Sequence, residues 1–206
     1  MPITSALFDF GGVILSSPFE AFARYEDERG LPDGFIRSVN SYDHHTNAWA
    51  RLERNEMTAD EFAIAFEDES AALGHRVSGW DVLGLLAGEL RPEMVEVVRR
   101  CNEKLKTGLL TNNVVSMGVD SPVAHVVEMF DVVIESSVVG VRKPEPRFYE
   151  LACERLEIEP SDAVFLDDLG INLKPARAMG MHTIKVMSPG QALDELEALV
   201  GFPLRG

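Results

Sequence analysis

The stretch of sequence that decides the fold is Leu7-Phe8-Asp9-Phe10-Gly11-Gly12-Val13-Ile14, in which an apolar run meets one carboxylate and then two glycines. Such a run is typical of a buried strand, where an unpaired charge is costly unless a site uses it. By itself the octapeptide leaves two interpretations of Asp9 open: a functional carboxylate, or a residue that only begins the turn before the glycines. The rest of the chain has to decide between them.

Short apolar runs recur along the chain and alternate with longer amphipathic stretches. The runs cover residues 6–10, 107–110, 132–134, 163–166 and 183–186, and expected helices begin near residue 91 and cover 146–156 and 171–179. This alternation predicts an α/β fold with a doubly wound, Rossmann-like and mostly parallel sheet. Ligands bind beyond the carboxyl ends of strands in such a sheet, so the residues that follow each run are the candidates for a site.

One region, residues 18–90, has no convincing strand. Helical patterns cover residues 19–29, 45–56 and 58–73, and Thr58-Ala59-Asp60-Glu61 has the spacing of a capping box. We therefore expect an α/β core domain made of residues 1–17 and 91–206, with an all-helical domain of residues 18–90 inserted after the first strand.

The amino-acid composition and net charge exclude some classes of binding partner. The chain has 206 residues, 46% of them hydrophobic, and a formal net charge of −15. This acidity disfavours binding to nucleic acid and to anionic membrane surfaces. The sequence begins without the pattern of a signal peptide and has no apolar run of bilayer length, so we expect a cytoplasmic protein. Its two cysteines, Cys101 and Cys153, are expected to be reduced core residues.

Polar side chains follow the expected strands and one later segment. They are Asp9, Thr111-Asn112-Asn113, Arg142-Lys143-Pro144 and Asp167-Asp168, with Asn172 after them. Carboxylates that meet at strand ends repel each other unless a cation lies between them, and their hard oxygen ligands suit Mg²⁺. Lys143 offers a positive charge and Thr111 a hydroxyl for a phosphate oxygen. The set is typical of phosphoryl transfer with a carboxylate nucleophile.

Over essentially its whole length the sequence resembles the haloacid dehalogenase superfamily. The resemblance rests on four motifs in the family's order: Asp9-Phe10-Gly11-Gly12-Val13, Leu109-Leu110-Thr111-Asn112, Arg142-Lys143-Pro144 and Phe165-Leu166-Asp167-Asp168. Residues 165–177 are most similar to the phosphatase-type N-terminal domain of soluble epoxide hydrolases and their bacterial relatives. In that group the inserted helical segment is a cap domain.

The resemblance implies roles for the motif residues at the nucleophile and metal. Asp9 would be the nucleophile that becomes a phosphoaspartate. Asp9, the backbone carbonyl of Gly11 and the side chain of Asp167 would bind Mg²⁺. Asp168 and Asn172 would lie around these ligands and shape the site.

The resemblance also implies how the phosphoryl group is held. Thr111 would donate a hydrogen bond to it, and Asn112 would border it. Lys143 would neutralise the charge of both Asp9 and the phosphoryl group.

Gly11 departs from the family's pattern. Family phosphatases usually carry a second Asp two residues after the nucleophile, which protonates the leaving group and then activates water. A glycine keeps the backbone carbonyl for the metal but lacks the acid, a loss of roughly 10²- to 10⁴-fold in rate for a poor leaving group. His44 and His45 are candidates for the missing acid, beside the simpler interpretation that they have no function.

These observations predict a magnesium-dependent phosphatase that acts on a small phosphate monoester, a phosphorylated metabolite. Two alternatives stay open. A metal-independent dehalogenase would use the same nucleophile, but the pair Asp167-Asp168 argues against it. A phosphate-binding or regulatory protein with little turnover would account for Gly11.

Overall fold

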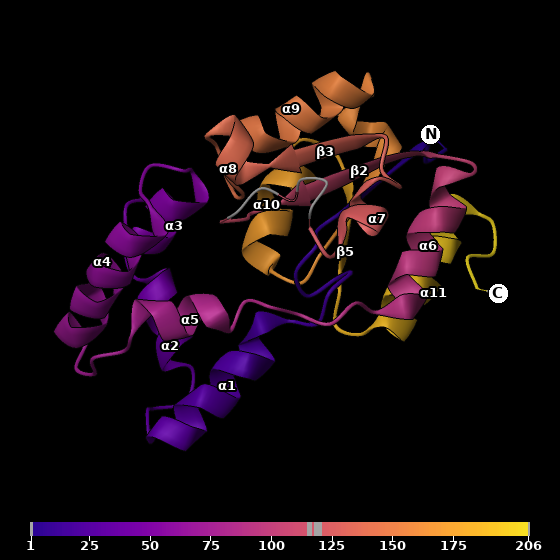
Figure 1. The fold of residues 1–206 in the computed structure, drawn as a ribbon. Coiled ribbons are helices and arrows are strands. Elements are labelled where there is room, and N and C mark those ends of the chain that lie inside the picture. The colour runs from indigo at the N-terminus through magenta and orange to yellow at the C-terminus, as the bar shows by residue number, and fades with distance from the viewer. Residues whose placement is uncertain (1, 115–116, 118–120, 206) are drawn as a thin grey trace.

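A five-stranded parallel sheet forms the centre of the α/β part of the chain (Figure 1). The computed structural model describes residues 2–114, 117 and 121–205. The strands are β1 (Ser5–Phe8), β2 (Lys106–Thr111), β3 (Val132–Glu135), β4 (Ala163–Asp167) and β5 (His182–Lys185), in the order β3-β2-β1-β4-β5. In this register Phe8 pairs with Leu109 on one side and with Leu166 on the other. The carboxyl ends of β2, β1 and β4 therefore lie side by side.

Helices cover both faces of the sheet, as its buried strands require. Alternate residues of β1 point to opposite faces: Phe8 joins the buried cluster that includes α6 (Pro92–Asn102), α7 (Ala124–Val127) and α11 (Pro189–Val200). Leu7 joins the other cluster, under α9 (Pro146–Leu156) and α10 (Gly170–Ala178). The short α8 (Ser136–Val139) follows β3, and a 3₁₀ turn (Pro160–Asp162) precedes β4. The predicted doubly wound α/β fold is confirmed.

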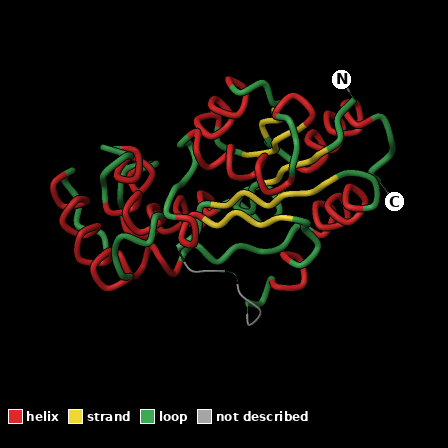
Figure 2. The backbone as a smooth tube through the Cα atoms, turned by 90° about the horizontal axis from the view of Figure 1, so that it is seen from above, coloured by secondary structure: helices red, strands yellow, loops and turns green. Residues whose placement is uncertain are grey.

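Five helices lie together at one end of the molecule, away from both termini (Figures 1 and 2). They are α1 (Pro18–Arg29), α2 (Phe35–Ser41), α3 (Ala48–Glu53), α4 (Ala59–Ala72) and α5 (Gly79–Gly84). They share a buried cluster of their own, built around Phe22, Ile36, Phe62 and Phe66. Leu90 forms an isolated antiparallel bridge with Leu15, and residues 18–90 contain no strand. We call residues 18–90 the helical segment.

Local hydrogen bonds explain where the helices of this segment begin. The side chain of Thr58 accepts from the backbone of Glu61, and the Glu61 carboxylate accepts from the backbone of Thr58, so the predicted capping box is confirmed at α4. The helix expected over 45–56 is shorter than predicted and begins at Ala48. The buried side chain of Asn47 caps it and also donates to the carbonyls of Asn40 and Tyr42, which holds the preceding residues in turns. The structure also adds α2 and α5, which the sequence analysis did not predict.

Both cysteines are buried and free, as predicted, and lie in the clusters on opposite faces of the sheet. Burial raises the pKa of the Cys101 thiol to about 12 and that of Cys153 to about 11, so both stay protonated at neutral pH. Among the described helices, none is both long and apolar enough to cross a membrane.

Candidate active site

Three carboxylates meet at the carboxyl edge of the sheet. Asp9 directly follows β1, Asp167 ends β4 and Asp168 follows it. One oxygen atom from each lies within 4.8 Å of the others. The Asp167 side chain is fully buried and that of Asp9 is 11% exposed. The parallel register of β1 and β4 thus brings together carboxylates that are far apart in the sequence.

Lys143 holds two of these carboxylates. Its Nζ lies 2.8 Å from Oδ1 of Asp9 and 2.8 Å from Oδ2 of Asp167, and its side chain is 1% exposed. Burial acts to lower the pKa of Lys143, but the ion pairs with Asp167 and Asp9 outweigh it and hold the pKa above its usual value. Lys143 is therefore a buried, protonated cation.

The cluster keeps an excess of negative charge, with three carboxylates against this one ammonium group. Burial raises the pKa of Asp9 well above its usual value, Lys143 offsets only part of this, and Asp167 adds to it. Burial and the nearby Asp167 raise the pKa of Asp168 to about 6. Each shift is one that a bound cation would oppose, so the site is suited to a metal ion.

Asp167 is oriented by its neighbours on the first turn of α10. Its Oδ1 accepts from the backbone N–H of Leu169 at 2.8 Å, and the side-chain amide of Asn172 lies 3.0 and 3.1 Å from its two oxygens. The backbone carbonyl of Asn172 in turn accepts from the hydroxyl of Tyr149 at 2.6 Å. These bonds leave Asp167 a single orientation.

The turn after β1 packs against the carboxylate of Asp168. The Asp9 amide donates to the Leu166 carbonyl at 2.9 Å, and Oδ1 of Asp9 accepts from the amide of Phe10 at 2.6 Å. Gly12 has a φ of 76°, and a Cβ there would overlap the carboxylate of Asp168. A Cβ at Gly11 would meet no atom within 4 Å. Gly12 is thus required by the geometry, whereas Gly11 leaves open space.

Asn112 lies between β2 and the segment that carries Lys143. Its Oδ1 accepts from the Lys143 backbone N–H at 2.8 Å, and its Nδ2 donates to the Lys143 carbonyl at 3.0 Å. Thr111 ends β2 with its side chain buried beside this pair. The sequence analysis expected Asn112 to border a phosphoryl group. In the structure both the oxygen and the nitrogen of its side-chain amide are hydrogen-bonded to the backbone of Lys143.

A cavity of about 500 Å³ opens over these residues. Its floor includes Asp9, Gly11, Thr111, Lys143 and Asp168. Apolar side chains from the helical segment and from α10 form much of the rest of its lining, among them Phe19, Phe22, Trp49, Leu86 and Ile171. A small molecule in this cavity would touch the carboxylates and the helical segment at once.

Comparison with known protein families identifies the family of this chain. A family model described as a haloacid dehalogenase-like hydrolase matches residues 3–180. The chain belongs to this family. Individual proteins also resemble this chain, some in sequence and some in fold.

Several curated proteins resemble this HAD-like hydrolase. It is 38% identical to mouse (Mus musculus) acyl-CoA dehydrogenase family member 10 over 97% of this chain, and 31% identical to pig (Sus scrofa) bifunctional epoxide hydrolase 2 over 99%. The chain spans only 19% and 40% of the lengths of those two proteins. It is 29% identical to phosphatase MT3486 of Mycobacterium tuberculosis over 94% of this chain and 92% of that protein.

Solved structures show the same fold. The magnesium complex of the HAD family enzyme BT-2542 from Bacteroides thetaiotaomicron superposes with a TM-score of 0.66 at 22% identity, over 95% of this chain and 98% of that one. The magnesium-bound hydrolase YfnB from Bacillus subtilis gives a TM-score of 0.64 at 18% identity, over 98% and 100%.

The structure of the HAD-like hydrolase brings the sequence-predicted site residues together. Asp9, Gly11, Thr111, Asn112, Lys143, Asp168 and Asn172 line the cavity, and the buried Asp167 joins them through Lys143. His44 also lines the cavity, and His45 is not among the described residues that do. The roles of these residues stay predictions.

Sequence reasoning missed Glu53, which ends α3 and lines the same cavity. It is 5% exposed and pairs with Arg142, which the sequence analysis treated only as part of a motif. A signal was available, because Glu53 lies one turn after Trp49 and directly after Leu52, two apolar positions of the same helix. A glutamate on the buried face of a helix needs partners from elsewhere in the fold.

Proposed function

We propose that this hydrolase is a magnesium-dependent phosphatase that cleaves a small phosphate monoester through a phosphoaspartate on Asp9. The observation that carries the proposal is the position of the Lys143 ammonium, 2.8 Å from both Asp9 and Asp167, on the floor of a cavity of substrate size. A buried cation beside a carboxylate nucleophile is suited to an incoming phosphoryl dianion.

The residues present fit Mg²⁺, because three neighbouring carboxylates carry more negative charge than one ammonium group neutralises, and a divalent cation would offset the excess. In our proposal Asp9, Asp167 and the carbonyl of Gly11 hold the metal, while Asp168 and Asn172 lie around them. When bound, Mg²⁺ would supply positive charge that stabilises the negative phosphoryl oxygens.

The chain's own groups account for the two chemical steps. An oxygen of Asp9 attacks phosphorus, the bond from phosphorus to the ester oxygen breaks, and the leaving group departs with its electron pair. Water then attacks the phosphoaspartate, releases inorganic phosphate and restores Asp9. Thr111 and Lys143 orient the phosphoryl group in both steps. Because Gly11 carries no acid, the leaving oxygen takes its proton from water in the cavity.

Two named relatives support this proposal. Phosphatase MT3486 matches this chain over most of the length of both proteins. BT-2542 has been solved in complex with magnesium and inorganic phosphate, the proposed metal and product, on the same fold at 21% identity. Residues 18–90 would act as the cap domain on the core of residues 1–17 and 91–206, because they supply much of the apolar lining above Asp9.

Hydrolysis of p-nitrophenyl phosphate, followed with and without Mg²⁺, tests the proposal. Wild-type protein should be active only with Mg²⁺, and Asp9→Asn should be folded and inactive, because an amide keeps the shape but is a much weaker nucleophile. If well-folded Asp9→Asn kept more than a few per cent of the activity, the covalent mechanism would be wrong. Metal-independent turnover of 2-chloropropionate would instead indicate a dehalogenase.

A second candidate function is phosphate binding with little turnover, and the open space at Gly11 favours it, since no acid occupies the position. In that case calorimetry would detect binding of inorganic phosphate in the presence of Mg²⁺, while no phosphate ester would be hydrolysed.

A further inference from the structure

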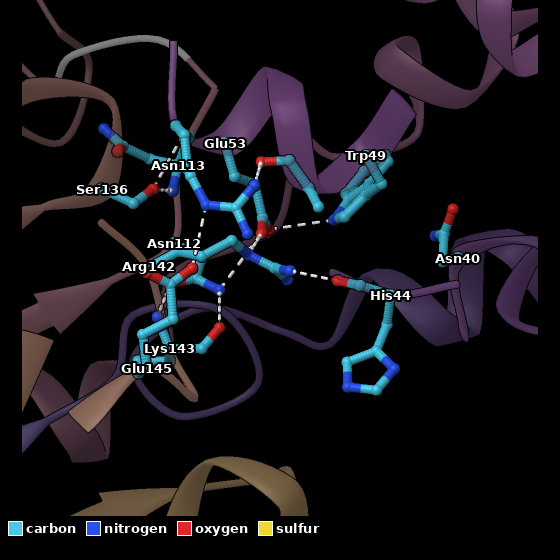
Figure 3. A network of polar contacts seen from close by, with 12 residues as sticks. Asn40, His44, Trp49, Glu53, Asn112, Asn113, Ser136, Arg142, Lys143 and Glu145 are labelled. Carbon is cyan, nitrogen blue, oxygen red and sulfur yellow. Dashed lines mark hydrogen bonds and ion pairs between the residues drawn. The ribbon is translucent and has the colours of Figure 1, made fainter. Parts of the chain in front are cut away.

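Glu53 connects the helical segment to the end of β2 (Figure 3). Its carboxylate accepts from Trp49 Nε1 at 2.9 Å on its own helix and from Asn112 Nδ2 at 3.1 Å on the core, and it pairs with the guanidinium of Arg142. Burial raises the pKa of the Glu53 carboxyl above its usual value, while the pairing with Arg142 and the bond from Trp49 act to lower it. The three donors hold the side chain of Glu53 in place as a hydrogen-bond acceptor.

Glu53 and the backbone of Lys143 together hold the Asn112 amide in one orientation. Nδ2 has two hydrogens, which point to the Glu53 carboxylate and to the Lys143 carbonyl, while Oδ1 accepts from the Lys143 N–H. Turning the amide over would set its oxygen against two acceptors and its nitrogen against a donor. Glu53 thus adds a third contact, from the helical segment, to the orientation in which Asn112 binds both polar groups of the Lys143 backbone.

Arg142 provides a second link at the same place. It precedes Lys143 in the chain, pairs with Glu53 and donates from Nη1 to the backbone carbonyl of His44 at 2.9 Å (Figure 3). Two consecutive core residues, Arg142 and Lys143, are therefore tied to one glutamate of the helical segment. The ammonium group of Lys143 lies between Asp9 and Asp167.

We propose that Glu53 is a positioning residue for Lys143, acting through Asn112 and Arg142, so that the ammonium group is correctly placed only when the helical segment is seated on the core. Glu53 lines the cavity, but its carboxylate bonds Trp49, Asn112 and Arg142 and does not bond Asp9. A displacement of the order of 1 Å in a catalytic group can lower a rate by about 10²-fold, so a contact of this kind has a large effect on turnover. Only the kinetic part of this inference rests on the proposed phosphatase activity.

Amide hydrogen exchange measured by NMR tests the positioning directly and needs no substrate. The Lys143 amide is bonded to Asn112 Oδ1, so it should be protected in the wild type. In Glu53→Gln the side chain has a single acceptor oxygen in place of two, and the Lys143 amide should exchange at least about tenfold faster. Asn112→Ala, which removes the bond itself, should give the same increase.

Glu145→Gln is the matched control. Glu145 also crosses the junction between core and helical segment, through an ion pair of 2.9 Å with Arg54, but its side chain bonds neither Asn112 nor Lys143. Exchange at Lys143 and turnover should both stay within about twofold of the wild type. Unchanged exchange in Glu53→Gln, or an equal increase in Glu145→Gln, would overturn the proposal.

Kinetics provide the second measurement. Glu53→Gln and Asn112→Ala should each lower kcat for p-nitrophenyl phosphate by about 10- to 100-fold, the usual range for groups that orient a catalytic residue, with a smaller change in KM. In the double variant the loss should be smaller than the product of the two single losses, because both changes remove the same contact between Glu53 and Asn112. Losses that multiply would contradict the proposal. An inactive wild type would refute the phosphatase function, and hydrogen exchange would still decide the role of Glu53.

Discussion

Two neighbouring glycines in the turn after β1 are subject to different constraints. Gly12 combines a left-handed φ with direct contact to Asp168, so any side chain there would strain the backbone and displace a carboxylate of the site. Gly11 has neither constraint, and its position opens into the cavity. Absence of an acid at residue 11 is therefore a chemical feature of the site and is not imposed by packing.

This difference predicts the effect of Gly11→Asp. Without an acid, turnover should fall steeply as the leaving group becomes more basic, so aryl phosphates should be hydrolysed much faster than sugar phosphates. Gly11→Asp fits the open space and should flatten this dependence, mainly by raising kcat for alkyl esters by about 10²-fold or more. The measurement is a plot of log kcat against leaving-group pKa for both proteins. Equal slopes would mean that another group, with His44 the first candidate, already donates the proton.

Asp167 and Asp168 should contribute unequally to the metal site. Asp167 is fully buried and oriented by Asn172 and Leu169, whereas Asp168 is less buried and accepts a 3.5 Å bond from the Ser17 hydroxyl. Calorimetric titration with Mg²⁺ should therefore show a larger loss of affinity for Asp167→Ala than for Asp168→Ala. The reverse order would exchange the two assignments.

At the scale of elements, the two helix caps at Thr58 and Asn47 differ in how many groups they bond and how deeply they are buried. Thr58 is exposed and forms only its own capping box, while Asn47 is 6% exposed and bonds the carbonyls of Asn40 and Tyr42 as well as capping α3. Because α3 carries Glu53, the cap at Asn47 also supports the contact with the active-site lysine.

The caps predict different outcomes for two alanine variants. Thr58→Ala should lower the free energy of unfolding by about 1 kcal/mol and leave kcat unchanged. Asn47→Ala should cost more than about 2 kcal/mol, because it leaves buried carbonyls without partners, and it should also lower kcat. Urea unfolding and steady-state kinetics on the same preparations check both. A similar cost for the two variants would contradict this distinction.

At the scale of the whole molecule, the sheet order creates the charge cluster. The strand order reverses at β1, which is flanked by β2 and β4, so the ends of three strands deliver Asp9, Thr111 and Asp167 to one place. Burial at this place, together with the neighbouring carboxylates, raises the pKa values of Asp9 and Asp168 and makes the metal-free fold less stable once these two groups ionise.

This predicts a pH dependence of stability in the metal-free protein. The pKa of Asp168 is about 6 in the fold, above its ordinary 3.8, so its contribution to stability is fully present below about pH 4 and is lost as the pH rises through about 6. Asp168→Asn should therefore gain stability relative to the wild type between about pH 4.5 and about pH 7 in EDTA, and Mg²⁺ should reduce this gain at the higher pH. Urea unfolding at both pH values measures it. A stability difference that does not change with pH would show that Asp168 is not perturbed in this way.

Much of the α/β part could be predicted from the sequence, because apolar runs and the residues that end them are local signals. All five expected strands exist, with no end shifted by more than two residues. The first ends at Phe8 because the carbonyl of Phe10 accepts the hydrogen bonds of the next turn. The helical segment was harder, since α2 and α5 are short and owe their stability to packing in a shared cluster.

The sequence by itself determined the residues at the strand ends, Asp9, Thr111 and Asp167, and the separate motif that carries Lys143. Only the tertiary structure decided that Glu53 faces these residues, that Asn112 binds the Lys143 backbone, and that Gly11 leaves open space. The physical reason is the sequence separation of the residues that interact. Strand ends and caps depend on residues a few positions apart, whereas the contact between Glu53 and Asn112 joins positions 59 residues apart and exists only when the helical segment lies against the sheet edge.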